Sequence, residues 1–156
     1  RYEMSLEKFI KENINNIGND NRIYIAPYID NEKLQNTINT ICKGIDADDI
    51  LAIYDSTVFG SSKEGLVFTK DSLFYREPLL KAIKIKYKDI KEVTYEKKKV
   101  ENKKRKFETE EMIVIKVEGE KKIVLIKNVL KVNLEVLSEF INNIINEFVK
   151  NELDGI

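Results

Sequence analysis

The densest group of chemically active side chains lies in residues 97–106, where seven of ten positions are cations. On a hairpin tip, such a cluster can contact anionic lipid headgroups, at about 1 kcal/mol per cation, or nucleic-acid phosphates. It can equally belong to an exposed, flexible hairpin whose lysines only keep a sheet edge soluble, because short charge runs are common. We favour this second interpretation. The candidate residues for binding an anion or a partner are Lys97, Lys98, Lys99, Lys103, Lys104, Arg105 and Lys106.

Charge is unevenly distributed along a chain whose formal net charge is zero. Residues 78–106 hold twelve basic and four acidic side chains, so an anionic partner can be steered toward this part of the chain. Only Phe107 follows the cationic run, and no aromatic residue is interleaved with it to stack on bases. Among anionic partners we therefore expect a membrane surface rather than nucleic acid.

The second candidate site is a polar loop at residues 55–65. Hydroxyls and backbone N–H groups in such a loop can bind a small anion. The loop lacks the G-x-x-x-x-G-K-[ST] spacing of a phosphate-binding loop, so we favour a structured turn that Val58 and Phe59 anchor to the core. The polar residues in question are Ser56, Thr57, Ser61, Ser62 and Lys63.

Catalytic and metal-binding chemistry has little support in the residue types present. The chain has no histidine, which excludes Ser–His and Cys–His nucleophiles and histidine metal sites. Asp46, Asp48 and Asp49 lack the glycine and distal glutamate of a calcium loop, and we expect them to cap and solubilise a helix–strand junction. With 27 acidic residues, any carboxylate pair chosen from sequence is arbitrary. We expect no enzyme activity, no cofactor and no metal.

Composition indicates a globular protein of one domain, or of one domain with a helical extension. The 156 residues are 42% apolar and 35% charged, which is enough to bury a core beneath a charged surface. No apolar run reaches about 18 residues and no secretory signal precedes the first predicted helix. A single cysteine, Cys42, excludes an internal disulfide. We expect a cytoplasmic protein, peripheral to the membrane at most, and the abundance of Ile, Lys and Asn suggests a bacterial source.

Alternating apolar residues separated by polar turns predict seven short strands in the middle of the chain. The segment 82–87 shows the pattern most clearly, with Ile83, Ile85 and Tyr87 on one face and lysines on the other. This is the pattern of a half-buried antiparallel strand. The predicted strands cover residues 50–54, 66–69, 73–76, 82–87, 90–95, 112–117 and 123–126.

Helical spacing flanks this region on both sides. Ser5 can cap a first helix that Gly18 stops, and Asp30 can cap a second that ends at Gly44. Between them Pro27 argues against a central strand. Residues 133–151 form a wide apolar stripe, so this last helix must cover the open end of the sheet. The predicted fold is α+β: a seven-stranded antiparallel barrel or sandwich (47–156) capped by a C-terminal helix and preceded by a helical pair (1–46).

Two stretches of the strand region carry a family resemblance. Residues 65–75, Gly-Leu-Val-Phe-Thr-Lys-Asp-Ser-Leu-Phe-Tyr, and residues 83–93, Ile-Lys-Ile-Lys-Tyr-Lys-Asp-Ile-Lys-Glu-Val, resemble bacterial pleckstrin-homology-like domains of the GRAM type. In that family a T-x-x-x-L-y-y hairpin leads to an I-p-Y-x-x-I-x-x-V strand pair. The resemblance covers roughly residues 48–150. It implies a pleckstrin-homology-like sheet with a C-terminal helix, on a fold that hosts lipid, peptide and protein binders alike.

Our preferred hypothesis is a non-enzymatic binding module whose partner is a protein or peptide. A sheet edge or the groove beside the last helix would take that partner. The first alternative is a peripheral membrane module that applies residues 97–106 to anionic lipid. The second is a self-associating or regulatory domain whose N-terminal helices pair between chains.

Overall fold

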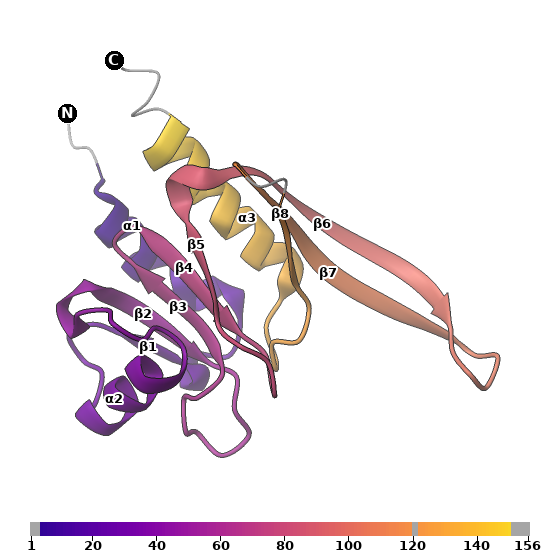
Figure 1. Ribbon diagram of the computed structural model, residues 1–156, viewed down its shortest axis with the longest axis horizontal. Coiled ribbons are helices and arrows are strands. Elements are labelled where there is room, and N and C mark those ends of the chain that lie inside the picture. The colour runs from indigo at the N-terminus through magenta and orange to yellow at the C-terminus, as the bar shows by residue number, and fades with distance from the viewer. Residues whose placement is uncertain (1–3, 120–121, 151–156) are drawn as a thin grey trace.

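The computed structural model describes residues 4–119 and 122–150 as a mixed α+β fold (Figure 1). Residues Glu120 and Asn151, which the sequence placed in a turn and at a helix end, lie outside the described residues. The helical elements are α1 (Leu6–Asn13), η1 (Ile14–Ile17), η2 (Asp20–Arg22), α2 (Asn31–Thr40), η3 (Ala47–Asp49), η4 (Tyr87–Asp89), α3 (Leu134–Ile144) and the π-helical turn η5 (Ile145–Lys150).

All seven predicted strands are present, and an eighth, β1, precedes them. Two of the seven are much longer than the apolar pattern predicted, because their distal halves are made of charged residues. The strands are β1 (Ile23–Ile25), β2 (Ile50–Asp55), β3 (Gly65–Thr69), β4 (Ser72–Arg76), β5 (Ile83–Lys86), β6 (Ile90–Glu101), β7 (Phe107–Val117) and β8 (Lys122–Ile126).

The strands form two separate antiparallel sheets. One has the order β1-β2-β3-β4-β5 and the other the order β6-β7-β8. A closed barrel, one of the two predicted forms, is therefore wrong: β5 and β6 follow each other in sequence across η4 but belong to different sheets. The mixed α+β class, the antiparallel pairing and the C-terminal helix are confirmed.

The C-terminal helix α3 connects the two sheets. Its Phe140 ring lies 5.3 Å from that of Phe68 on β3 and 5.7 Å from that of Phe9 on α1. On the other side, the Asn142 side chain donates to the carbonyl of Val93 on β6, at 3.1 Å. Figure 1 shows α3 running between the sheets, so its wide apolar stripe is buried from both directions.

The N-terminal segment contains the two predicted helices and also contributes an edge strand to the larger sheet. Strand β1 lies between the two helices in sequence and pairs with β2, and it is an edge strand, as the nearby Pro27 requires. Helix α1 packs in the main core, while the apolar residues that begin with Leu34 on α2 pack in a second cluster. The division between residues 1–46 and 47–156 remains a prediction.

Local sequence signals fix the helix starts. Ser5, Asp30 and Asn133 each accept a hydrogen bond from a backbone N–H of the first turn, as predicted for the first two. Gly18 ends the first helical segment, although the last turn before it is the 3₁₀ turn η1. Among the described residues, no helix is both long and apolar enough to cross a membrane.

Candidate functional site: a loop-end groove and a basic arm

Three loops meet at one end of the five-stranded sheet, at the bottom of Figure 1. They are the β2–β3 loop (56–64), the β4–β5 loop (77–82) and the segment from β8 to α3 (127–133). Between them lies an open groove of about 800 Å³, which we call the loop-end groove. Its lining residues are Ser56, Thr57, Val58, Phe59, Ser61, Glu64, Pro78, Lys127, Asn128, Val129, Leu130 and Lys131.

Large apolar side chains project from two of these loops. Phe59 and Leu79 are each 98% exposed, Val58 is 73% exposed and Leu80 is 54% exposed. The prediction that Val58 and Phe59 anchor the β2–β3 loop to the core is therefore wrong. A cluster of exposed apolar side chains on neighbouring loops is typical of an interaction surface.

Buried polar contacts, rather than apolar ones, hold the β2–β3 loop. Lys33 of α2 places its Nζ 2.8 Å from Asp55 Oδ2 and 2.9 Å from the carbonyl oxygen of Gly60. Thr37 shares a hydrogen bond with Ser62 at 2.8 Å. Helix α2 therefore fixes the shape of a loop about 25 residues away in sequence. The sequence carried no signal for this pairing, because Lys33 is one of 27 basic residues.

The Lys33–Asp55 pair is almost entirely removed from water, with side chains 9% and 3% exposed. Burial acts to lower the pKa of Lys33, but the hydrogen bond and charge of Asp55 outweigh it and raise that pKa. Burial acts to raise the pKa of Asp55, but hydrogen bonds from Lys33 and Thr57 outweigh it and lower that pKa. Both groups are therefore held in their charged forms at neutral pH.

The other loops are tied to the first. Arg76 donates from Nη1 to the carbonyl of Lys63 at 2.6 Å and from Nε to the carbonyl of Leu80 at 3.0 Å. The backbone N–H of Leu130 donates to Ser56 Oγ at 2.8 Å. The groove is consequently preformed. The hydroxyls of Ser56, Thr57 and Ser62 are engaged in internal bonds, which is consistent with the favoured structured turn rather than with the alternative of a small-anion site.

Each of the three loops contains a non-glycine residue with a positive φ. The values are 59° for Ser62, 66° for Leu79 and 63° for Lys131. This conformation costs an ordinary residue about 1–2 kcal/mol. Leu79 is notable because its side chain is almost fully exposed, so no packing energy offsets the cost.

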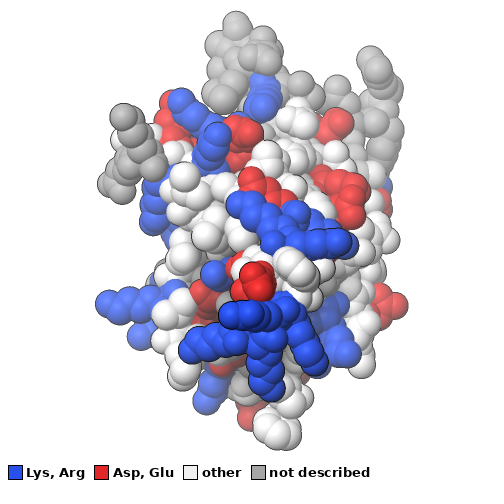
Figure 2. All heavy atoms as spheres, turned by 90° about the vertical axis from the view of Figure 1, so that its right-hand side faces the viewer, with Lys and Arg blue, Asp and Glu red and all other residues white. Residues whose placement is uncertain are grey.

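The predicted basic cluster lies on a two-stranded arm formed by the distal parts of β6 and β7. Strand β8 pairs with β7 only from Ile113 to Val117, so the arm extends beyond the third strand. Figure 2 looks at the side toward which the arm points, and Lys and Arg side chains gather in the lower part of that face. The structure divides the seven predicted residues into two groups.

The first group, Lys97, Lys98 and Lys99, lies in the ladder between β6 and β7. Lys97 pairs with Glu111 and Lys98 with Glu110, whereas Lys99 lies opposite Thr109. Two of these three lysines thus lie opposite glutamates, which supports hairpin pairing. The local charge of this part of the arm is therefore much lower than the sequence run suggested.

The second group forms the turn at the tip: Lys103, Lys104, Arg105 and Lys106. Asn102 orders this turn, because its Oδ1 accepts from the backbone N–H groups of Lys104 and Lys106, at 2.9 and 3.1 Å. The turn contains no acidic residue, and none of its four cations forms an ion pair with a described residue. The tip is therefore the most strongly cationic part of the arm.

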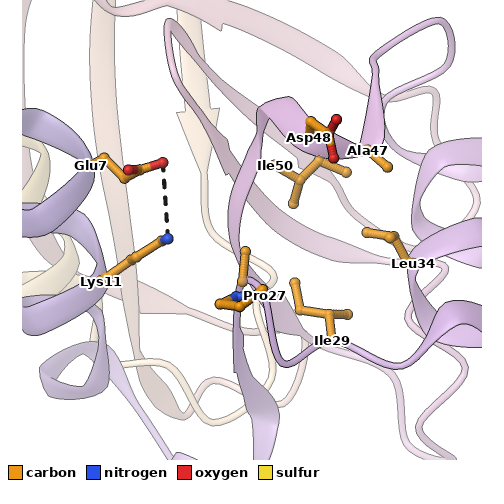
Figure 3. A pocket seen from close by; sticks show the side chains of 9 residues that line it. Glu7, Lys11, Pro27, Ile29, Leu34, Ala47, Asp48 and Ile50 are labelled. Carbon is orange, nitrogen blue, oxygen red and sulfur yellow. Dashed lines mark ion pairs between the residues drawn. The ribbon is translucent and has the colours of Figure 1, made fainter.

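A smaller pocket of about 270 Å³ lies beside α1 (Figure 3). Pro27, Ile29, Leu34 and Ile50 give it apolar walls. At its rim the Nζ of Lys11 lies 3.9 Å from Oε1 of Glu7. The two charges therefore offset each other, and neither of them alone would attract a ligand. Its volume is below the range of about 300–1,000 Å³ that is usual for small-molecule sites.

Of the three aspartates near η3, Asp46 acts as the capping residue and Asp49 forms an ion pair at the surface. Asp46 accepts a hydrogen bond from the backbone N–H of Asp48 at 3.0 Å, and Asp49 lies 3.6 Å from the Nζ of Lys70. In the described part of the chain, no group of three or more His, Cys, Asp or Glu side chains is arranged to hold a metal ion.

No protein-family model, no curated protein and no solved structure matches this chain.

Proposed function

We propose that the chain is a non-enzymatic, pleckstrin-homology-like binding module that takes a segment of another protein in the loop-end groove. The observation that carries the proposal is the exposure of Phe59 and Leu79, 98% each, on loops that are held in place by hydrogen bonds. The order of strands followed by a C-terminal helix supports the pleckstrin-homology-like part of the proposal.

Preorganisation is the physical reason for favouring binding at this groove. A loop that is already ordered loses little conformational entropy when a partner docks, so more of the contact energy appears as affinity. Exposed aromatic and aliphatic side chains are the groups that supply such contact energy. The positive φ of Leu79 fits the same view, because a strained backbone is retained where it presents a useful side chain.

The test is photo-crosslinking in the native host. A benzoyl-phenylalanine placed at Phe59 should give discrete crosslinked products, and the same group at Val100, 41% exposed on the arm, should not. Leu79→Gly should weaken the Phe59 crosslinks. Because glycine accepts a φ of 66°, this variant should also raise the free energy of unfolding by about 1 kcal/mol. Equal crosslinking from both positions would refute the proposal.

A second candidate function is attachment to an anionic membrane, and the unpaired cations of the tip favour it. At about 1 kcal/mol per cation, the four tip residues would contribute on the order of 4 kcal/mol. The exposed Phe59 and Leu79 could then enter the interface.

Vesicle co-sedimentation separates this candidate from the first. Binding should require phosphatidylserine in phosphatidylcholine vesicles, and should weaken between 0.1 and 0.5 M salt. Replacing Lys103, Lys104, Arg105 and Lys106 with glutamine should abolish it. The matched control replaces Lys97 and Lys98, and should have a smaller effect because Glu111 and Glu110 lie opposite them in the ladder. Sedimentation that depends on neither anionic lipid nor salt concentration would refute attachment to an anionic membrane.

Self-association through the N-terminal helices has less support. The apolar residues of α1, including Ile10, are buried in the main core, and those of α2, including Leu34, pack in the second cluster. Neither helix keeps a free apolar face for a second chain.

A further inference from the structure

Strand β8 is an edge strand that lacks the usual protection against pairing. Its four residues between Lys122 and Lys127 are Ile, Val, Leu and Ile, with no charged or proline residue among them. Within residues 4–119 and 122–150, the backbone of β8 forms hydrogen bonds only with β7. One row of backbone N–H and C=O groups, along a strand about 17 Å long, therefore has no hydrogen-bond partner among the described residues.

The other sheet edges are protected. Strand β1 has only three residues and is followed by Pro27. Strand β5 alternates with Lys84 and Lys86, and β6 carries lysines and glutamates through its distal half. Charges, prolines and short length are the means by which proteins prevent edge pairing. Neither a charge nor a proline lies between Lys122 and Lys127 in β8, which suggests that this edge pairs with another strand.

The outward side chains of β8 are also apolar. Ile123 is 57% exposed and Leu125 is 40% exposed, while Val124 and Ile126 point into the core. Leu125 stands opposite the half-buried Val114 of β7. The outer face of the three-stranded sheet thus exposes apolar side chains on its edge strand, β8.

The sequence of β8 is complementary to itself. When two copies of β8 run antiparallel with Val124 opposite Val124, Ile123 of each copy lies opposite Leu125 of the other. The outer face then carries two Ile–Leu pairs, while the inner face sets Val124 against Val124 and Lys122 against Ile126 at each end. We propose that a second copy of this chain pairs with β8, which joins the two three-stranded sheets into one six-stranded sheet about a twofold axis.

The pairing should be weak. An interface built on five residues of one strand falls below the roughly 1,200 Å² of a standard protein interface. We therefore expect association that depends on protein concentration in the micromolar range or above. The proposal concerns a surface separate from the loop-end groove and stands independently of the function proposed for that groove.

Cysteine crosslinking tests the register. The native chain has one cysteine, Cys42, and it is fully buried, so it does not interfere. Under mild oxidation a mixture of Ile123→Cys and Leu125→Cys chains should give more disulfide-linked dimer than either variant alone. If both single variants crosslink as efficiently as the mixture, the proposed register is refuted.

Sedimentation velocity from 5 to 500 μM, on the order of the expected range, tests the association itself. The wild-type chain should show a rising mean mass, and Leu125→Lys should shift the midpoint at least tenfold. The matched control is Val100→Lys, because Val100 is equally exposed at 41% but lies on β6. It should leave the midpoint unchanged. A wild-type chain that stays monomeric throughout, or a control that weakens association equally, would overturn the proposal.

Discussion

Replacing Lys33 with methionine should destabilise the protein strongly, because it leaves the Asp55 carboxylate buried without its cation. The two side chains are 9% and 3% exposed and their charged atoms are 2.8 Å apart. Removing one partner of such a pair typically costs about 3–5 kcal/mol. Asp55 keeps two bonds, from the backbone N–H and the hydroxyl of Thr57 at 2.9 and 2.6 Å, so we expect the lower half of that range.

The loss should depend on pH in a defined direction. In the wild type the pKa of Asp55 is lowered, so its stabilising effect is present above the ordinary value of about 3.9 and is lost as the pH falls through the lowered value. The pKa of Lys33 is raised, so its effect is complete at neutral pH and is lost only in strong alkali. Without Lys33, the hydrogen bond and charge that lower the pKa of Asp55 against the effect of burial are gone, so the carboxyl takes up a proton at a higher pH than in the wild type, within the acid range. The penalty should shrink there.

Urea unfolding followed by circular dichroism measures both effects, at pH 7 and pH 4. The control is Lys70→Met, because Lys70 and Asp49 lie 3.6 Å apart with side chains about half exposed, and this change should cost less than about 1 kcal/mol. The double variant Lys33→Met, Asp55→Asn should recover part of the loss. A cost for Lys33→Met below about 1 kcal/mol, or one equally large at both pH values, would refute the account of the buried pair.

Three further predictions concern the loop and the core. Gly65→Ala should lower the free energy of unfolding by more than about 2 kcal/mol in urea, because φ is 135° and a Cβ would lie 2.0 Å from the Tyr54 carbonyl oxygen. The control Gly60→Ala, with a φ of 76° and open space around the Cβ, should lower it by about 1 kcal/mol. Equal losses for the two variants would contradict this prediction. Cys42, buried and with a pKa raised to about 11, should not react with a thiol reagent at pH 7 until the chain unfolds, and rapid native labelling would contradict its burial. Leu137→Ala on α3 should cost about 2–5 kcal/mol by the same unfolding assay, and a loss below 1 would mean that the helix is loosely packed.

Local patterns in the sequence were sufficient to locate the elements. Short apolar runs between polar turns, with clear alternation in residues 82–87, identified the seven strands that follow residue 47, and Ser5 and Asp30 marked two helix starts. These signals act over a few residues, because side-chain direction in a strand and capping in a helix depend on the local backbone. Strand β1 was missed because three residues are too few for a periodic pattern.

Long-range pairing decided how the candidate sites are built. The β2–β3 loop looked as if apolar residues anchored it, but Lys33 and Thr37 of α2 hold it, and Phe59 is displayed to solvent. The basic run looked uniform, but strand pairing sets Lys97 and Lys98 against glutamates and leaves Lys99 and the four cations of the tip without an acidic residue opposite them.

The sequence by itself determined where most of the strands and helices lie, and where cationic side chains gather along the chain. Only the tertiary structure decided which of those residues remain available to a partner. The physical reason is that availability depends on contacts between residues far apart in the chain. A lysine is free or neutralised according to the strand opposite it, and a phenylalanine is core or surface according to what holds its loop.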